Sequence, residues 1–518
     1  MKFMSAFPKR IVAGILSSVA GVGLWTASAQ NVDVDQVKAK AEKGDAKSQL
    51  VLGTMYYRGQ GVLQHFAEAA KWFRKAADQG DPVAQKNVAS MYYHGQGVQQ
   101  SDVEAANWFR KAADQGDAQA QIELGLMYVN GQGIRADAAQ GGKLFRKAAD
   151  QGHPVAQKNL GVLYLKGQGV PQDNAEAAKW FRKAADQGEP QAQNELARML
   201  TGGIGVSKDE AEAAKWFKKA ADQGEPTAQR NLGMLYYLGQ GVAADDAEAL
   251  KWLRKAAESG DTQVHYYLGL MHVGGRGVAK DPNEALKHFR AGAEAGDSMS
   301  QNELGSWYEK GGSVPVDLPE AVKWYRKAAD QGFVLAQHNL GILYANGRGV
   351  DKDLAEALKW YRKAADQGFV LAQHNLGVLY ANGMGGAKDS AEALKWYRKA
   401  AEQGNAVSQN ELGFMYDQGL GVEKNPEQAI AWFRKAAEQG LDIAQQNLGI
   451  LYTKERGSVA PDLVEAYKWF NLAAAQGNTN AVNNRDLVMR RLTADQINEG
   501  QKRAAEFLGK KPPGASSR

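Results

Sequence analysis

The sequence predicts an all-α protein, a right-handed α/α superhelical solenoid of helix-turn-helix repeats. Three observations predict it: a repeat length of 36 residues, apolar residues at helical spacing within each repeat, and glycines where each helix should end. The tryptophan of the string KWFRKAADQG marks the period, and its position is held by Trp72, Trp108, Trp180, Trp216, Trp252, Trp324, Trp360, Trp396, Trp432 and Trp469. Because ten of the twelve tryptophans share one position in the repeat, we expect that position in the core.

The first helix of a repeat is illustrated by residues 153–188. Ala156, Leu160 and Leu163 fall at i, i+4 and i+7, which predicts one apolar helix face. Gly167 should end this helix, because glycine adopts the left-handed backbone that closes a helix.

The second helix follows the glycine loop. Asp173 precedes it as a helix cap, and Glu176 three residues later has the spacing of a capping box. Glu176, Lys179 and Lys183 are expected on an ordinary solvated outer face.

One glycine lies in the middle of the first helix, where it costs about 1 kcal/mol relative to alanine. This position is Gly161 in the example, glycine in ten repeats, and alanine only at Ala89 and Ala197. The strict limit on size predicts that a backbone or a large ring packs directly against it.

Five segments are expected along the chain. Residues 1–29 have the pattern of a secretory signal, with a basic start, an apolar stretch of 15 residues and a small-residue cleavage site. The other four are an N-terminal capping half-repeat at 30–44, twelve repeats at 45–477, C-terminal capping helices at 478–508 and a disordered tail at 509–518. We therefore expect a periplasmic or secreted protein. The apolar stretch is shorter than the roughly 20 residues of a span, so no integral span is expected after cleavage, and an uncleaved anchor is the alternative.

Composition excludes several classes of function. Cysteine is absent, which rules out disulfide frameworks, thiolate metal sites and cysteine nucleophiles. Without the basic residues of the signal, 60 basic residues face 58 acidic ones. That balance gives no electrostatic footprint for nucleic acid.

The repeat resembles a known family. The motifs A-Q-x-x-L-G-x-x-Y, G-x-G-V and E-A-x-K-W-[FY]-x-x-A-A-x-x-G resemble the Sel-one-like repeat (SLR) family, a branch of the tetratricopeptide-repeat (TPR) superfamily. The resemblance implies an adaptor or scaffold, as in many exported bacterial members. One subgroup with paired cysteines is linked to penicillin binding and β-lactam hydrolysis, and this chain departs from it by lacking cysteine.

No enzyme motif is present. The chain has no S-x-x-K, K-T-G, H-E-x-x-H or G-x-x-x-x-G-K-[ST] sequence, so no catalytic residue, metal site or cofactor is predicted. Three histidines, His265, His272 and His288, replace a glutamine, a tyrosine and a tryptophan of one repeat. Two interpretations of these histidines are open: a metal or pH-sensitive site, or, more simply, a locally repacked core. His338 and His374 lie one repeat apart in nearly identical units, which duplication explains.

A binding surface is predicted on the first helices, on the side turned away from the core. In tetratricopeptide-like solenoids this side lines the concave face. One position is apolar in eight repeats, at Leu126, Val162, Met234, Leu270, Ile342, Val378, Phe414 and Ile450. A nearby position carries asparagine at Asn87, Asn159, Asn231, Asn339, Asn375 and Asn447, with Glu123, Glu195, Glu303 and Glu411 in between.

An apolar row beside amides suits an extended polypeptide, because amides bond to peptide groups and apolar side chains receive alternate residues. The alternative is that neighbouring first helices bury the row between themselves. The predicted function is a periplasmic scaffold that binds a protein or peptide. A cell-envelope glycan or peptidoglycan module using Tyr57, Tyr93 and Tyr237 is the second hypothesis, and a hydrolase the third.

Overall fold

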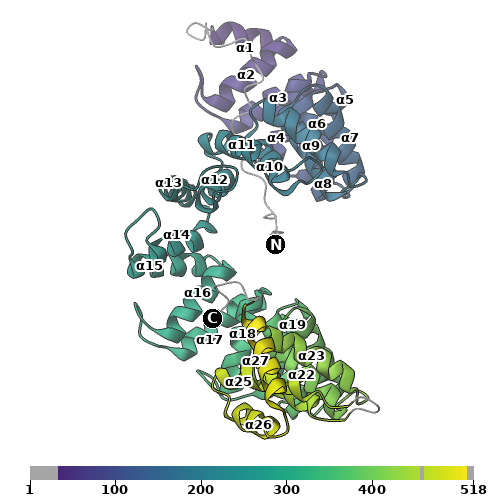
Figure 1. Ribbon diagram of the computed structural model, residues 1–518. Coiled ribbons are helices and arrows are strands. Elements are labelled where there is room, and N and C mark those ends of the chain that lie inside the picture. The colour runs from purple at the N-terminus through teal and green to yellow at the C-terminus, as the bar shows by residue number, and fades with distance from the viewer. Residues whose placement is uncertain (1–32, 456–459, 510–518) are drawn as a thin grey trace. The chain divides into compact units, whose positions relative to one another are not determined.

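The protein is described by a computed structural model that covers residues 33–455 and 460–509. Within these ranges every regular element is an α-helix, and the helices follow one another as packed pairs, which confirms the predicted solenoid class (Figure 1). The chain forms two compact units, the first ending at Asp261 and the second beginning at Thr262. The signal expected at 1–29 and residues 510–518 of the expected tail lie outside the described residues.

The first unit holds the cap helix α1 (Val34–Glu42) and six helix pairs. The first helices of these pairs are α2 (Ala46–Arg58), α4 (Pro82–His94), α6 (Ala118–Asn130), α8 (Pro154–Lys166), α10 (Pro190–Gly202) and α12 (Pro226–Leu238). The second helices are α3 (Phe66–Asp78), α5 (Asp102–Asp114), α7 (Ala138–Asp150), α9 (Asn174–Asp186), α11 (Glu210–Asp222) and α13 (Asp246–Glu258). Each helix packs on the next along the chain.

The second unit repeats the arrangement six times. Its first helices are α14 (Val264–Gly274), α16 (Ser298–Lys310), α18 (Val334–Asn346), α20 (Val370–Asn382), α22 (Ala406–Gln418) and α24 (Asp442–Tyr452). Its second helices are α15 (Pro282–Glu294), α17 (Leu318–Asp330), α19 (Leu354–Asp366), α21 (Ser390–Glu402), α23 (Pro426–Glu438) and α25 (Leu463–Ala475).

Two more helices follow the last pair, α26 (Thr479–Met489) and α27 (Ala494–Gly509), and both pack on α25. Helix α27 begins with a true capping box, in which Thr493 Oγ1 accepts from Gln496 N and Gln496 Oε1 accepts from Thr493 N. The ring of Phe507 meets the Trp469 ring edge-on at 5.3 Å, so α27 covers the last tryptophan.

The second helices begin differently from the prediction. The Asp173 carboxylate caps Glu176 N as expected, but Asp173 N donates to the carbonyl of Tyr164. The Glu176 carboxylate accepts from Trp180 Nε1 at 2.9 Å, and the Lys183 ammonium lies 4.0 Å from the Trp180 ring. The outer face predicted as ordinary solvated surface is therefore, in part, a polar cover that holds the tryptophan.

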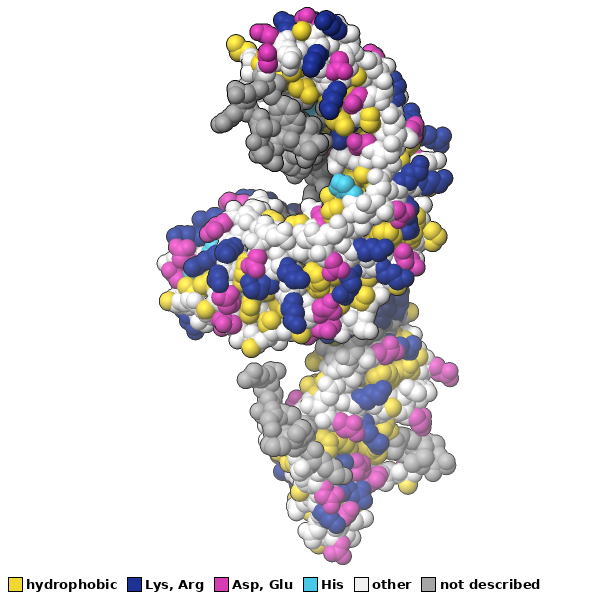
Figure 2. Space-filling view, turned by 90° about the horizontal axis from the view of Figure 1, so that it is seen from above, with side chains coloured by type: hydrophobic (Ala, Val, Ile, Leu, Met, Phe, Trp, Pro, Cys, Tyr) yellow, Lys and Arg dark blue, Asp and Glu magenta, His cyan; other side chains and the backbone are white. Residues whose placement is uncertain are grey.

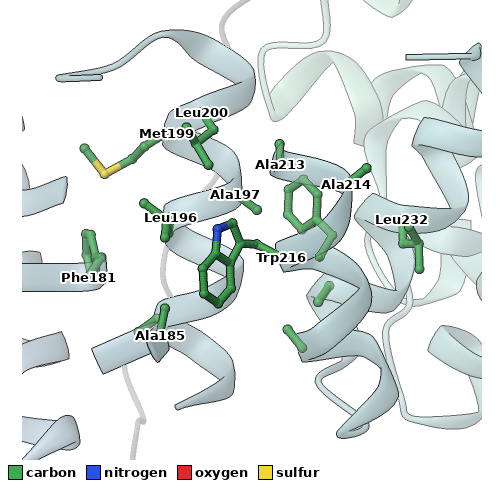
Figure 3. Close-up of a cluster of buried hydrophobic side chains, with 14 of the residues drawn as sticks. Phe181, Ala185, Leu196, Ala197, Met199, Leu200, Ala213, Ala214, Trp216 and Leu232 are labelled. Carbon is green, nitrogen blue, oxygen red and sulfur yellow. The ribbon is translucent and has the colours of Figure 1, made fainter. Parts of the chain in front are cut away.

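The tryptophan position is core, as predicted. Nine of the ten indoles are buried, and only Trp432 is half-buried. In the first unit the indole of Trp216 lies between α11 and α10, against Leu196 and Ala197 (Figure 3). Most mid-helix glycines face an aromatic ring of the second helix, since a Cβ on Gly341 would stand 2.7 Å from the ring of Tyr361, whereas Gly233 faces the side chain of Leu253. A large side chain, in most repeats an aromatic ring, is thus what limits this position to glycine or alanine.

The loop between the two helices holds neighbouring repeats together by close backbone contact. Gly169 has a φ of +70°, and a Cβ there would stand 2.3 Å from the carbonyl carbon of Ala138, in the preceding repeat. Both facts require glycine.

Buried glutamines form a second link between repeats. Gln373 Nε2 donates to the carbonyl of Ala365 at 3.2 Å, and Gln373 Oε1 accepts from Gln403 Nε2 at 2.7 Å. The same pair of bonds recurs along both units. In the repeat 262–297 the two glutamine positions are instead His265 and Ala295, so these two side chains cannot form the bond.

Candidate functional site on the first helices

We call the outward side of the first helices the first-helix face. In α18 it is formed by Leu335, His338, Asn339 and Ile342, and the equivalent positions of the other first helices continue it. These side chains lie on the side of the helix opposite to Leu340, which is fully buried. In α18 the face therefore has two apolar positions, with two polar positions between them.

The predicted apolar row is only partly free. Seven of its eight residues, all except Phe414, are half-buried. Ile342 and Val378 pack against core clusters that join the second helix of their own repeat to the next repeat. Phe414 is 45% exposed. The row thus joins neighbouring repeats and also offers an apolar edge to solvent.

The predicted asparagine row is partly engaged within the protein. Asn447 Nδ2 donates to Asn410 Oδ1 at 3.0 Å, and Asn231 and Asn339 bond in the same way to the preceding repeat. Each bond uses one of two N–H donors and leaves the amide carbonyl for another partner. The row is therefore a chain of linked amides with remaining hydrogen-bonding capacity.

Carboxyl groups interrupt this row. Burial raises the pKa of Glu303 and that of Glu411, and the amide of the preceding asparagine opposes the rise in each case. Burial likewise raises the pKa of Glu123. These side chains are half-buried and favour the neutral form more than a free glutamate does.

Sequence reasoning missed a second apolar row on the same face. The residue seven positions before Ile342 is Leu335, and its equivalents in the next three repeats are Leu371, Val407 and Ile443. These four side chains are 41%, 50%, 44% and 48% exposed. The 36-residue spacing of these four apolar residues is the signal that marks the row in the sequence.

Ion pairs occupy the first-helix face of the first unit. Lys86 pairs with Asp117 at 3.1 Å, and Arg230 pairs with Asp261 at 2.7 Å, each joining a first helix to the turn that precedes the next first helix. Lys158 and Glu189 form a longer pair at 3.8 Å, where burial lowers the pKa of Lys158 and raises that of Glu189. These charged side chains of the face are thus paired with one another inside the protein.

The three histidines of the repeat 262–297 lie together, with His288 in contact with both of the others. His265 Nδ1 and His288 Nδ1 lie 3.2 Å apart, at hydrogen-bonding distance. The rings of His272 and His288 stack with centroids 5.5 Å apart. No group of three or more His, Cys, Asp or Glu side chains among the described residues is arranged to hold a metal ion. The contact between His265 and His288 is what a locally repacked core predicts, with one imidazole bonded to another.

His338 and His374, on the first-helix face, bond to the following repeat and not to each other. His338 Nε2 lies 3.2 Å from Asn375 Nδ2, and His374 Nδ1 lies 2.9 Å from Ser408 Oγ. Burial lowers the pKa of both imidazoles. Their neutral forms are thus part of the same polar row.

The tyrosines considered for a glycan site make contacts within the protein. The Tyr57 ring meets Phe66 edge-on at 5.3 Å, and its hydroxyl donates to Gln96 Oε1 at 2.9 Å. The Tyr93 hydroxyl accepts from Gln132 Nε2 at 3.4 Å. All three rings, that of Tyr237 included, are half-buried.

The outer surface carries both signs of charge. Figure 2 shows Lys and Arg side chains interspersed with Asp and Glu side chains over the face in view.

No helix of the described residues is long and apolar enough to cross a membrane.

Comparison with known proteins identifies the family. Twelve consecutive segments, from residue 46 to residue 478, match the Sel1 repeat. The chain belongs to the Sel1 repeat family. Proteins built from Sel1 repeats serve as scaffolds for protein interaction and are generally not catalysts.

Relatives of this Sel1 repeat protein include two solved structures. A protective antigen of uropathogenic Escherichia coli strains with an SLR fold is 35% identical, with a TM-score of 0.66 and coverage of 94% of this chain and 96% of that chain. A Sel1 repeat protein from Oxalobacter formigenes is 32% identical over 67% of this chain and 90% of that one, with a TM-score of 0.46. The secretory immunoglobulin A-binding protein EsiB of Escherichia coli O6:H1 is 46% identical over 46 residues, which is 9% of each chain.

Proposed function

We propose that this Sel1 repeat protein is an exported scaffold, periplasmic or secreted, whose first-helix face binds a protein or peptide. The observation that carries the proposal is the combination of exposed apolar side chains with linked amides on the first-helix face of the second unit. A solvated helix face is ordinarily polar, whereas Phe414 and the row from Leu335 to Ile443 are apolar and exposed. The scaffold role of the family supports a protein partner.

Export is supported by the sequence of residues 1–29 and by the two Escherichia coli relatives, one named for binding secretory immunoglobulin A and one described as a protective antigen. Fusion of the first 35 residues to a reporter that is active only in the periplasm should export the reporter, with cleavage after Ala29. A reporter that stays in the cytoplasm would contradict the localisation.

The binding claim is tested with one substitution on the face and one control. Proteins captured from envelope extract by the mature chain are identified by mass spectrometry, and the chief partner is purified. Phe414→Asn should weaken its binding at least tenfold without lowering the melting temperature, because exposed sites shift stability by less than about 0.5 kcal/mol.

The matched control is Leu63→Asn, at a loop residue that is 91% exposed and lies outside the first-helix face. This variant should bind the partner as the unmodified chain does. If both variants lost binding equally, or if neither lost binding, the site would lie elsewhere on the protein.

A further inference from the structure

The second apolar row is confined to one part of the chain. At its position the first six repeats carry Lys47, Val83, Gln119, Val155, Gln191 and Thr227, which is a mixed and largely polar series. From α18 to α24 the same position is Leu335, Leu371, Val407 and Ile443 without interruption. A single exposed leucine is common on a protein surface. Exposed apolar residues at four consecutive equivalent positions are instead typical of an interaction site.

In these four repeats the polar positions lie between two apolar rows. Leu371 and Val378 are seven residues apart on α20, which corresponds to roughly 10 Å along the helix. His374 and Asn375 lie between them on the same face. The face thus has an apolar border on each side of a hydrogen-bonding centre.

An extended polypeptide matches this order of groups. Its backbone N–H and C=O groups can bond to the central amides, and its successive side chains point to opposite sides. One side chain then meets the row from Leu335 to Ile443, and the next meets the row from Ile342 to Ile450. Because both borders are apolar, both sets of side chains must be apolar.

The scarcity of charged side chains between the two rows favours an uncharged ligand. Between the two rows, from α18 to α24, Glu411 is the one carboxyl position and no lysine or arginine occurs. Burial raises the pKa of Glu411 and lowers the pKa of His338 and of His374. A charged segment would therefore lose hydration here without gaining a strong opposite charge.

From these observations we infer that the first-helix face of α18, α20, α22 and α24 binds an extended, uncharged peptide segment with consecutive apolar side chains. The inference rests on the proposed function and adds to it the location of the site and the chemistry of the ligand. The first unit lacks the second border and should not share this preference.

The test uses fluorescein-labelled ten-residue peptides and the mature chain in fluorescence anisotropy. One peptide carries six consecutive apolar residues, valine alternating with leucine, between Gly-Ser ends. A second peptide has every other apolar residue replaced by serine, and a third has glutamate at the same places. The first peptide should bind at least tenfold more tightly than the other two.

Two pairs of substitutions locate the site. Leu371→Gln with Val407→Gln should weaken the apolar peptide at least tenfold, whereas Val83→Gln with Val155→Gln, at the same helix position of the first unit, should change binding less than twofold. Leu335→Gln with Ile443→Gln serves as a second pair, should the first pair lower the melting temperature.

Equal binding of the three peptides, or a site variant that binds as tightly as the unmodified chain, would overturn the inference. If capture of the envelope partner then still depends on Phe414, the proposed function stands without it. Sedimentation of the unmodified chain as a dimer that the Leu371→Gln, Val407→Gln pair dissociates would also overturn it, because the row would then join two copies of the chain.

Discussion

At the scale of single residues, the tryptophan position shows how burial and polar cover act together. Trp360 is 4% exposed, lies in a core cluster with residues of α17 and α18, and has the Lys363 ammonium 3.8 Å from its ring. Trp360→Ala should lower the free energy of unfolding by about 3–5 kcal/mol, since it empties a large buried volume. Chemical denaturation followed by hydrogen exchange should place the loss in the repeats around residue 360.

The control for this prediction is Trp432→Ala, because Trp432 holds the same position but is half-buried. Its effect should be smaller. A loss under 1 kcal/mol for Trp360→Ala would show that this position does not stabilise the repeat.

His338 makes stability depend on pH. Burial lowers the pKa of this imidazole, whose Nε2 lies 3.2 Å from Asn375 Nδ2. Below pH about 6.5 the unfolded chain binds a proton that the folded chain resists, so stability is present at neutral pH and is lost as the pH falls. The loss between pH 6.5 and pH 5 is at most about 2 kcal/mol for one histidine.

The variant His338→Asn isolates this effect. Asn302 and Asn410 hold the equivalent position in other repeats and accept the same bond from the following repeat. Thermal unfolding at pH 7 and pH 5 should show a smaller acid loss in the variant than in the unmodified chain. Equal acid losses would mean that His338 takes up its proton as readily in the folded state. A difference measurement is needed because Glu303 and Glu411, whose pKa values are raised, act in the opposite direction.

At the scale of elements, glycine is needed in the loops for two different reasons: a positive φ, and a lack of space for a Cβ. Gly169 has a positive φ, and a Cβ there would overlap the Ala138 backbone. Gly188 has a φ of +90° but has no atom within 4 Å of such a Cβ. Gly188→Ala should therefore cost only the left-handed conformation, roughly 1–2 kcal/mol. Gly169→Ala should cost clearly more, measured as the midpoint shift in urea. Equal shifts would show that the loop moves aside without penalty.

Much at this scale was predictable from the sequence. The 36-residue period, the helix pairs, the capping aspartates and the core tryptophans follow from spacing alone, because each repeats many times. The role of Glu176 did not follow, since its spacing fits both a capping box and a bond to Trp180 one turn later. Which bond forms depends on Asp173 N, which is taken by the carbonyl of Tyr164.

The candidate site was less predictable, for a physical reason. A helix wheel gives the direction of Ile342 and Asn339 but not how closely the next repeat packs. Ile342 turned out half-buried against the next core cluster, and Asn339 bonded to Asn302. The more exposed residue of the same face is Leu335, near the helix start, where the neighbouring repeat covers less.

At the scale of the whole molecule, two units built from one repeat differ in what their first-helix faces carry. In the first unit this face holds ion pairs such as that of Lys86 and Asp117. In the second unit it carries two apolar rows over four repeats. Repetition of the core conserves the scaffold, while substitution at the outward positions changes what each unit can bind.

Site-specific photocrosslinking tests the central claim, that the first-helix face of this scaffold receives its protein partner. A photoreactive phenylalanine analogue is placed either at Leu371, on the first-helix face of α20, or at Lys359, an exposed position of the second helix α19. With the purified envelope partner, position 371 should form a covalent adduct and position 359 should not. An adduct from position 359 without one from position 371 would contradict the account, because the partner would then lie on the second helices.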